Sequence, residues 1–245
     1  MKNPLKADTK PTMDYSVATK AASAIMKPVA QDTAPELARD VWDVIHHRRA
    51  VRRFSTVPVS REDIDRIIDA GRWAPSAINQ QSWHFTVLTD KALIIRLSSQ
   101  IKSASVKGIV KMGWKTLFHQ IADFIHAPHD YDYMRDEDVI FHGAPVVVFL
   151  SAPRSNEWAA LDIGMCAQNM MLTAQAMGIN SCPIGLATYV EHAADVGMLH
   201  LPGGHHVHLA LVFGYAAEIP MAKERKTDNV VFVEVDRYAA TPLPQ

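Results

Sequence analysis

Residues 158–177 form the strongest helical segment of the sequence, and they restrict how the chain can fold. Apolar residues fall around almost the whole circumference of such a helix: Leu161, Ile163, Met165, Met170, Met171, Leu172 and Met177. A helix that is apolar on every side is buried, either in a core or at a subunit interface. Gly178 follows as the expected C-cap. We therefore expect this helix at the centre of the core or of a dimer.

The remaining elements follow from apolar spacing and from cap residues. Helices begin where a hydroxyl residue precedes a carboxylate by three positions, at Thr33 and at Ser60. Strands are expected where apolar residues alternate or run continuously. Residues 74–81 should form an irregular loop, 182–185 a tight connection and 126–138 a mobile flap. Helices are expected from Thr33 into 48–53, over 60–73, over 91–120 and near 190–199. Strands are expected over 83–89, 145–150, 206–215 and 230–235.

Length and charge limit the classes of protein to which the chain can belong. With 245 residues it can form one large domain with an arm, and we expect an extended or loosely helical arm at 1–32 and a domain at 33–245. A formal net charge of −1 argues against a protein that coats nucleic acid. No apolar run reaches the roughly 18 residues of a membrane span. Two widely spaced cysteines indicate a reducing compartment, the cytoplasm.

Positive charge is concentrated in two short stretches. Residues 46–54 (His-His-Arg-Arg-Ala-Val-Arg-Arg-Phe) hold four guanidinium groups, and Lys223, Arg225 and Lys226 form a second group. Guanidinium forks suit a phosphate better than an ammonium does, so the pattern indicates a small anionic ligand. Two alternatives remain open at this point. One is a solvated helix end or turn, and the other is a module that binds nucleic acid or an acidic partner through 48–53.

A histidine pair suggests a metal site as a further alternative. His206 and His208 would point to the same face of a strand, which suits two ligands. No third ligand stands at a familiar spacing. We therefore expect a partly exposed strand entry without a metal.

Four motifs, in this order, resemble the FMN-dependent nitroreductase family. They are Arg-Arg-Ala-Val-Arg-Arg-Phe at 48–54, similar to R-R-S-x-R-x-F; Ala-Pro-Ser-Ala-Ile-Asn-Gln-Gln-Ser-Trp-His-Phe at 74–85, similar to A-P-S-x-x-N-x-Q-P-W-x-F; the helix at 162–178 followed by Pro-Ile-Gly at 183–185; and Lys-Glu-Arg at 223–225. The resemblance covers roughly 40–235. It implies an α+β fold, with a mostly antiparallel sheet flanked by helices, in an intertwined homodimer with FMN at the subunit interface.

The resemblance assigns roles to the cationic residues. Three of them would hold the FMN phosphate, namely Arg48, Lys223 and Arg225. Arg49 and the Ala50 backbone would line the polyol chain and the pyrimidine edge. Arg52 would lie near N1 and O2, where a cation stabilises the negative charge of the reduced ring. Arg53 is expected in a surface salt bridge instead.

Two further groups would contact the flavin ring. Family members place the segment at 75–77 against the flavin of the other subunit, and the candidates in this loop are Pro75, Ser76, Ala77, Asn79 and Gln81. The Asn79 amide would bond the O4, N3 or O2 edge of the ring, and the alternative for Asn79 is an Asx turn. The second group would lie against the ring with a backbone N–H at N5: Pro183, Ile184 and Gly185.

The implied activity is that of an FMN-dependent oxidoreductase. Hydride would move from NAD(P)H to flavin N5 and then, in a ping-pong cycle, to a small acceptor such as a nitroaromatic or a quinone, and no protein acid or base is required. No G-x-G-x-x-G follows a strand, so NAD(P)H would stack on the flavin. Residues 114–134 would form a lid that selects the acceptor, and the alternative for each aromatic residue of this segment is a place in a helical core. A dehalogenase-like or flavin-handling protein is the alternative within the family, and no nucleic-acid or membrane partner is expected.

Two positions depart from the family pattern. Ala50 replaces the usual Ser, which leaves only backbone contacts to the flavin there. Ser82 replaces the Pro of Q-P-W, and we expect this to loosen the loop slightly.

Overall fold

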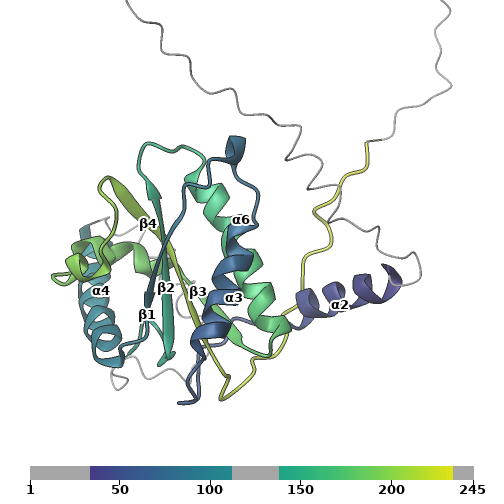
Figure 1. Ribbon diagram of the computed structural model, residues 1–245, viewed down its shortest axis with the longest axis horizontal. Coiled ribbons are helices and arrows are strands. Elements are labelled where there is room, and N and C mark those ends of the chain that lie inside the picture. The colour runs from purple at the N-terminus through teal and green to yellow at the C-terminus, as the bar shows by residue number, and fades with distance from the viewer. Residues whose placement is uncertain (1–33, 112–137, 234–245) are drawn as a thin grey trace, which may run out of the picture. The chain divides into compact units, whose positions relative to one another are not determined.

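The computed structural model describes residues 34–111 and 138–233 (Figure 1). The chain divides into two units, with the boundary between His46 and His47. The first unit contributes most of helix α2 (Ala34–His47), which begins after Thr33 as predicted. Trp42 stacks on His46 with ring centroids 4.0 Å apart, and the His46 Nδ1 lies 2.8 Å from the Trp42 carbonyl oxygen. Val41, Trp42 and Ile45 are exposed apolar residues of this helix.

A four-stranded antiparallel sheet forms the centre of the second unit (Figure 1). Its strands are β1 (His84–Leu88), β2 (Val146–Pro153), β3 (Asn180–Ile184) and β4 (His205–Gly214), in the order β1-β2-β4-β3. Leu150 pairs with Leu209, and a register shift after Leu150 marks a β-bulge. The central strand β2 is almost wholly buried, and β4 is buried over its second half, as their apolar runs predict.

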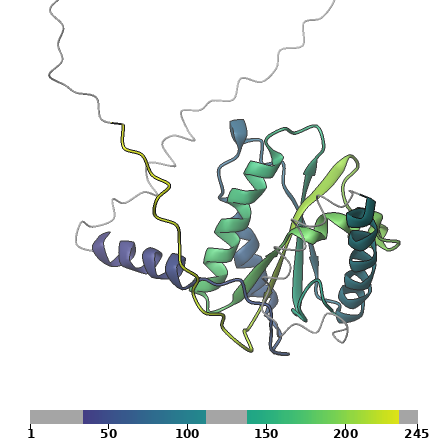
Figure 2. The ribbon, with the colours of Figure 1, turned by 180° about the vertical axis from the view of Figure 1, so that it is seen from behind.

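Helices cover both faces of this sheet, and Figure 2 shows the same layers from behind. On one face lie α3 (Arg61–Arg72) and α6 (Ala159–Ala176), and on the other lie α4 (Lys91–Lys111) and the 3-10 segments η2 (Gly185–His192) and η3 (Val196–Leu199). Ser60 caps α3, because its Oγ accepts the Asp63 N–H at 3.1 Å. Gly178 follows α6 with φ +74°, the left-handed conformation expected of a C-cap. The predicted α+β architecture is therefore confirmed.

Several element predictions need correction. Residues 182–185 were expected to be a tight connection, yet Asn180–Ile184 is a strand that pairs with β4. The helix expected near 190–199 consists of two 3-10 segments, η2 and η3. Residues 230–233 form no strand, since no described segment pairs with them, and a strand needs a partner. The flap at 126–137 and the end of the predicted helix beyond Lys111 lie outside the described residues.

The helix α6 is not buried on all sides within one chain. Ile163, Cys166 and Met170 pack in the core, whereas Leu161 is 57% exposed. No helix in the described ranges is both long and apolar enough to cross a membrane.

Candidate functional site

The arginine-rich stretch that follows α2 lies along the outer edge of β3. Ala50 forms a parallel bridge with Ser181, and the Val51 N–H donates to the Ser181 carbonyl oxygen at 3.1 Å. Val51 is fully buried and anchors the stretch, whereas Arg52 is exposed. The structure thereby brings together these predicted site residues from two distant motifs: Arg48, Arg49, Ala50 and Arg52 with Pro183, Ile184 and Gly185.

Arg48 has an unsatisfied buried donor. Its Nη1 atom is buried and has no hydrogen-bond partner in the described part of the chain. Burial lowers the pKa of this guanidinium, the Cys182 sulfur opposes the shift, and the charges of Arg225 and Arg49 lower the pKa further. A buried donor without a partner costs roughly 1–3 kcal/mol. The surroundings of Arg48 therefore favour an anion at this point.

The other cations divide between this point and the surface. The Arg225 charge contributes to the lowered pKa of Arg48, which indicates that this one arginine of the second basic group lies near the first group. Arg225 Nη1 also donates to the Lys223 carbonyl oxygen at 3.4 Å. Arg53 forms an exposed ion pair with Glu218 at 3.5 Å, as expected. Because Arg48 is half-buried and Arg53 is paired, the cluster does not present four free guanidinium groups to a nucleic acid.

The charge of Arg52 acts on two other groups, Cys182 and His142. Its charge opposes the pKa increase that burial causes in the Cys182 thiol. Burial lowers the pKa of His142 to about 4, and the Arg52 charge contributes to that decrease. The Arg52 side chain is exposed, so it is available to a ligand.

Residues 183–185, called the wall below, present mainly their backbone to the outside of the sheet edge. Pro183 and Gly185 are exposed, whereas the Ile184 side chain is 5% exposed and packs in the core. A Cβ placed on Gly185 would meet no atom within 4 Å, so the space in front of this residue is open. A planar ring could therefore approach the main chain closely here.

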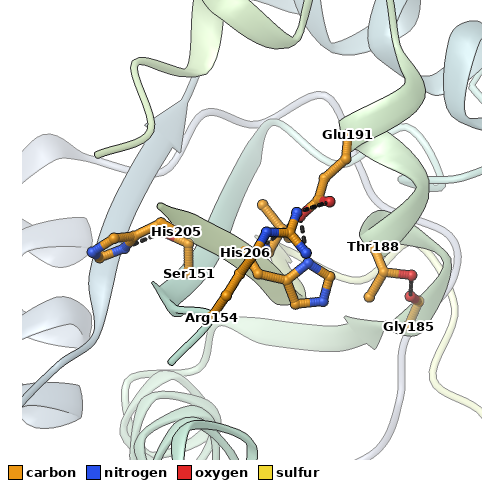
Figure 3. A network of polar contacts seen from close by, with 8 residues as sticks. Ser151, Arg154, Gly185, Thr188, Glu191, His205 and His206 are labelled. Atoms are coloured by element: carbon orange, nitrogen blue, oxygen red, sulfur yellow. Dashed lines mark hydrogen bonds and ion pairs between the residues drawn. The ribbon is translucent and has the colours of Figure 1, made fainter. Parts of the chain in front are cut away.

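Glu191 fixes the segment that follows this wall (Figure 3). Its carboxylate pairs with Arg154, just past β2, and with His206 Nδ1 on β4, and it also accepts a backbone N–H of β4. Burial alone would raise the pKa of Glu191, but these hydrogen bonds hold it below its ordinary value. Thr188 Oγ donates to the Gly185 carbonyl oxygen at 3.1 Å. The segment from Gly185 to Glu191 is thus tied to β4 and to the residue that follows β2.

The predicted group at 75–81 lies in the loop between α3 and β1, which contains the 3-10 turn η1 (Ala77–Asn79). Ser76 Oγ accepts the Gln81 N–H at 3.0 Å, and Gln81 Nε2 donates to Asn79 Oδ1 at 3.0 Å. Pro75, Asn79 and Gln81 are exposed. These bonds join three of the predicted residues to one another.

The loop at 75–81 does not meet Arg48 within one chain. Ala77 contacts Asp162 in the first turn of α6, whereas Ala50 pairs with Ser181, just beyond the last turn. At 1.5 Å per residue, the part of α6 from Asp162 to Ala176 is about 20 Å long. Ala77 and the bridge between Ala50 and Ser181 therefore lie toward opposite ends of this helix.

The structure limits the remaining expectations. The lid predicted at 114–134 lies outside the described residues. The rings of His206 and His208 meet edge to face at 4.9 Å, but within 34–111 and 138–233 no three His, Cys, Asp or Glu side chains form a metal site. Two cavities, of about 1050 and 760 Å³, are lined by residues other than Arg48 and Arg225.

Sequence reasoning missed the residues that hold the two groups in place. Asp162 lies in the first turn of α6 and is 1% exposed, and Asn156 precedes the same helix. A carboxylate inside an otherwise apolar helix was the available signal for Asp162. Glu191 and Arg154 carry no such signal, because their pairing depends on tertiary structure.

Comparison with known proteins identifies the family. Residues 45–215 match the model of the nitroreductase family. The chain belongs to the nitroreductase family. A 4-nitrobenzoate reductase from Pseudomonas putida is 29% identical over 201 residues, which cover 74% of this chain and 88% of the relative.

Two solved nitroreductase structures share the fold. A nitroreductase from Bacteroides fragilis with bound FMN has 28% identity and a TM-score of 0.62, and the match covers 79% of this chain and 98% of that one. The FMN-dependent nitroreductase NfnB from Mycobacterium smegmatis, in complex with NADPH, has 27% identity and a TM-score of 0.61, with 81% and 100% covered. Family membership confirms the resemblance, and the chain is an oxidoreductase of this family.

Proposed function

We propose that this chain uses FMN to pass a hydride from NAD(P)H to a small acceptor, such as a nitroaromatic or a quinone, in a ping-pong cycle. Relatives with these cofactors support the proposal, since one solved nitroreductase holds FMN and another is in complex with NADPH. The flavin supplies the redox chemistry when it is bound. The chain supplies binding and orientation, and its two free cysteines agree with a cytoplasmic protein.

The buried, unpartnered Nη1 of Arg48 is the observation that carries the proposal. A phosphate beside it would satisfy this donor and neutralise the repulsion from Arg225. Lys223 lies two residues from Arg225 and would contribute the third cation. The residues present therefore fit the phosphate of FMN.

We assign the ring to the edge between Arg52 and the wall at 183–185. Along the chain, Arg49 and the Ala50 backbone lie between Arg48, which we assign to the phosphate, and Arg52, which we assign to the ring. This order suits the polyol chain and the pyrimidine edge of the flavin. Arg52 would stabilise the negative charge that the reduced ring collects near N1 and O2. The open space before Gly185 supports close approach to its backbone N–H.

We further propose a homodimer in which the loop at 75–81 of each copy completes the site of the other. Ala77 and the bridge between Ala50 and Ser181 lie toward opposite ends of α6, which is about 20 Å long between Asp162 and Ala176. Large apolar side chains around it are exposed in a single chain, with Trp73 at 81% and Ile78 at 90%. Trp158 and Leu161 near the start of α6 are also more than half exposed. Such a patch is typical of a subunit interface.

Cofactor retention tests the phosphate assignment. We expect Arg48→Ala and Arg225→Ala to raise the Kd for FMN at least tenfold, because each removes a charge-assisted bond to the phosphate. Arg96→Ala is the matched control, since this arginine pairs with Asp195 at 2.8 Å on another element. Flavin fluorescence titration measures the Kd. If both Arg48→Ala and Arg225→Ala retain wild-type affinity, the assignment is wrong.

Sedimentation tests the dimer. We expect the wild-type chain to sediment as a dimer and Trp73→Glu, which places a charge on the exposed apolar patch, to shift it toward the monomer with loss of FMN. A wild-type monomer that binds FMN normally would contradict the shared site.

A further inference from the structure

Asp162 is a buried carboxylate that holds the loop at 75–81. It lies in the first turn of α6 and is 1% exposed. Its Oδ1 accepts the Ala77 N–H at 3.1 Å, whereas its Oδ2 is buried without a hydrogen-bond partner in the described part of the chain. Burying a carboxylate with one unsatisfied oxygen is costly, and the N-terminal end of the helix dipole offsets only part of that cost. A residue that lowers the stability of the fold in this way points to a role beyond stability.

The loop that Asp162 holds is strained. Three of its residues have positive φ although none is glycine: Ile78 at +46°, Asn79 at +56° and Gln81 at +48°. For Ile78 this is unfavourable, because a β-branched residue rarely adopts the left-handed conformation. Ile78 is also 90% exposed, so core packing does not hold it there. Such strain persists only where the surroundings determine the conformation, and it concentrates at functional sites.

The start of α6 also holds the other end of the loop. Asn156 Nδ2 donates to Ser82 Oγ at 2.7 Å, and Asn156 Oδ1 accepts the Trp158 N–H at 2.9 Å. Ser82 is the position at which we expected a loosened loop, and the serine hydroxyl instead provides an anchor that a proline could not. Asp162 and Asn156 therefore hold the loop on both sides of its strained residues.

We propose that Asp162 is a positioning residue that fixes Ala77 and, through the turn that follows, presents Asn79 to the flavin of a second copy. This inference rests on the proposed function, since the flavin and the second copy come from it. Asp162 does not touch the cofactor in this arrangement. It acts through the Ala77 amide, and the Asn156–Ser82 hydrogen bond supports it from the other side.

Amide hydrogen exchange on the flavin-free protein tests the anchoring without any cofactor. We expect Asp162→Leu, which cannot accept a hydrogen bond, to speed the exchange of peptides that cover 75–82 at least tenfold. Asp162→Asn keeps an acceptor oxygen and should exchange close to the wild-type rate. Asn156→Ala, a second variant in case Asp162→Leu fails to fold, should speed exchange at the Ser82 end. Wild-type exchange at 75–82 in the folded Asp162→Leu protein, or in Asn156→Ala where that protein does not fold, overturns the inference.

FMN titration of the same proteins tests the connection to the site. We expect Asp162→Leu to raise the Kd for FMN about tenfold and Asp162→Asn to restore most of the affinity. Asp90→Leu is the control, because it removes a carboxylate that accepts the Leu93 N–H at 2.7 Å at the start of α4. If the wild-type protein binds FMN and Asp162→Leu binds it with the same affinity, this inference is overturned and the proposed function stands. A wild-type chain that takes up no FMN overturns the proposed function and the inference with it.

Discussion

The pH dependence of stability should depend strongly on His142. This residue follows Phe141 in a tight turn with φ +61°, and it lies near Arg52. Burial lowers its pKa from 6.5 to about 4, and the Arg52 charge adds to the decrease. The folded protein therefore keeps this imidazole neutral at a pH where the unfolded chain would protonate it.

The sign and the size follow from that difference. Between about 6.5 and about 4 the unfolded chain binds more protons, so the free energy of unfolding falls as the pH is lowered through this range. One pKa unit corresponds to about 1.4 kcal/mol, which gives at most about 3.4 kcal/mol when the full range is crossed. At about pH 5 the loss should be about 2 kcal/mol relative to neutral pH.

The assay is urea denaturation of the wild type and of His142→Asn at about pH 7.5 and pH 5. Asparagine tolerates positive φ, so the turn should be kept. Both proteins lose stability as their carboxylates titrate, and comparing them removes that common part. We expect the wild type to lose about 2 kcal/mol more than His142→Asn between the two pH values. Equal losses in the two proteins would refute the claim that the fold keeps His142 neutral.

Three further outcomes are expected. Glu191→Gln should lower the free energy of unfolding by about 1–3 kcal/mol near neutral pH, as measured by urea denaturation. Because the folded pKa of Glu191 lies below its ordinary value, the difference between the two proteins should shrink as the pH falls below about 4.5. Gly214→Ala would place a Cβ 2.7 Å from the Pro145 side chain and should lower the free energy of unfolding by about 1–3 kcal/mol. The Cβ of Gly203→Ala would meet no atom within 4 Å, so thermal unfolding should show a much smaller loss for this variant. Burial raises the pKa of the Cys166 thiol to about 12, so a thiol reagent should modify it only after unfolding; rapid labelling of the native protein would contradict its burial.

Signals from residues close together in the sequence were enough to predict many of the helices and strands. The cap at Ser60, the alternation that marks β1 and the apolar runs of β2 and β4 each depend on neighbouring residues, and these elements appear as predicted. The strand β3 was missed because Pro183 normally argues against a strand; it is tolerated here because β3 lies at the end of the sheet.

The site could be predicted only in part, because its supports are tertiary. The motifs at 48–53 and 183–185 were expected to share a flavin, and the bridge from Ala50 to Ser181 brings them together. Nothing in the local pattern pairs Asp162 with Ala77, which lies 85 residues away, or Glu191 with His206. The sequence therefore provided candidate residues for contact with the flavin, whereas the residues that hold those candidates in place became visible only in the structure.

The bridge between Ala50 and Ser181 has a second effect. A strand at the end of a sheet exposes amides and carbonyls that can pair with other molecules, and short, charged neighbours are a common protection. The arginine-rich stretch occupies this margin of β3, and its positive charges repel a similar segment from another molecule. A variant that displaces the stretch should therefore become prone to aggregation as well as losing its ligand, so solubility and cofactor content should fall together.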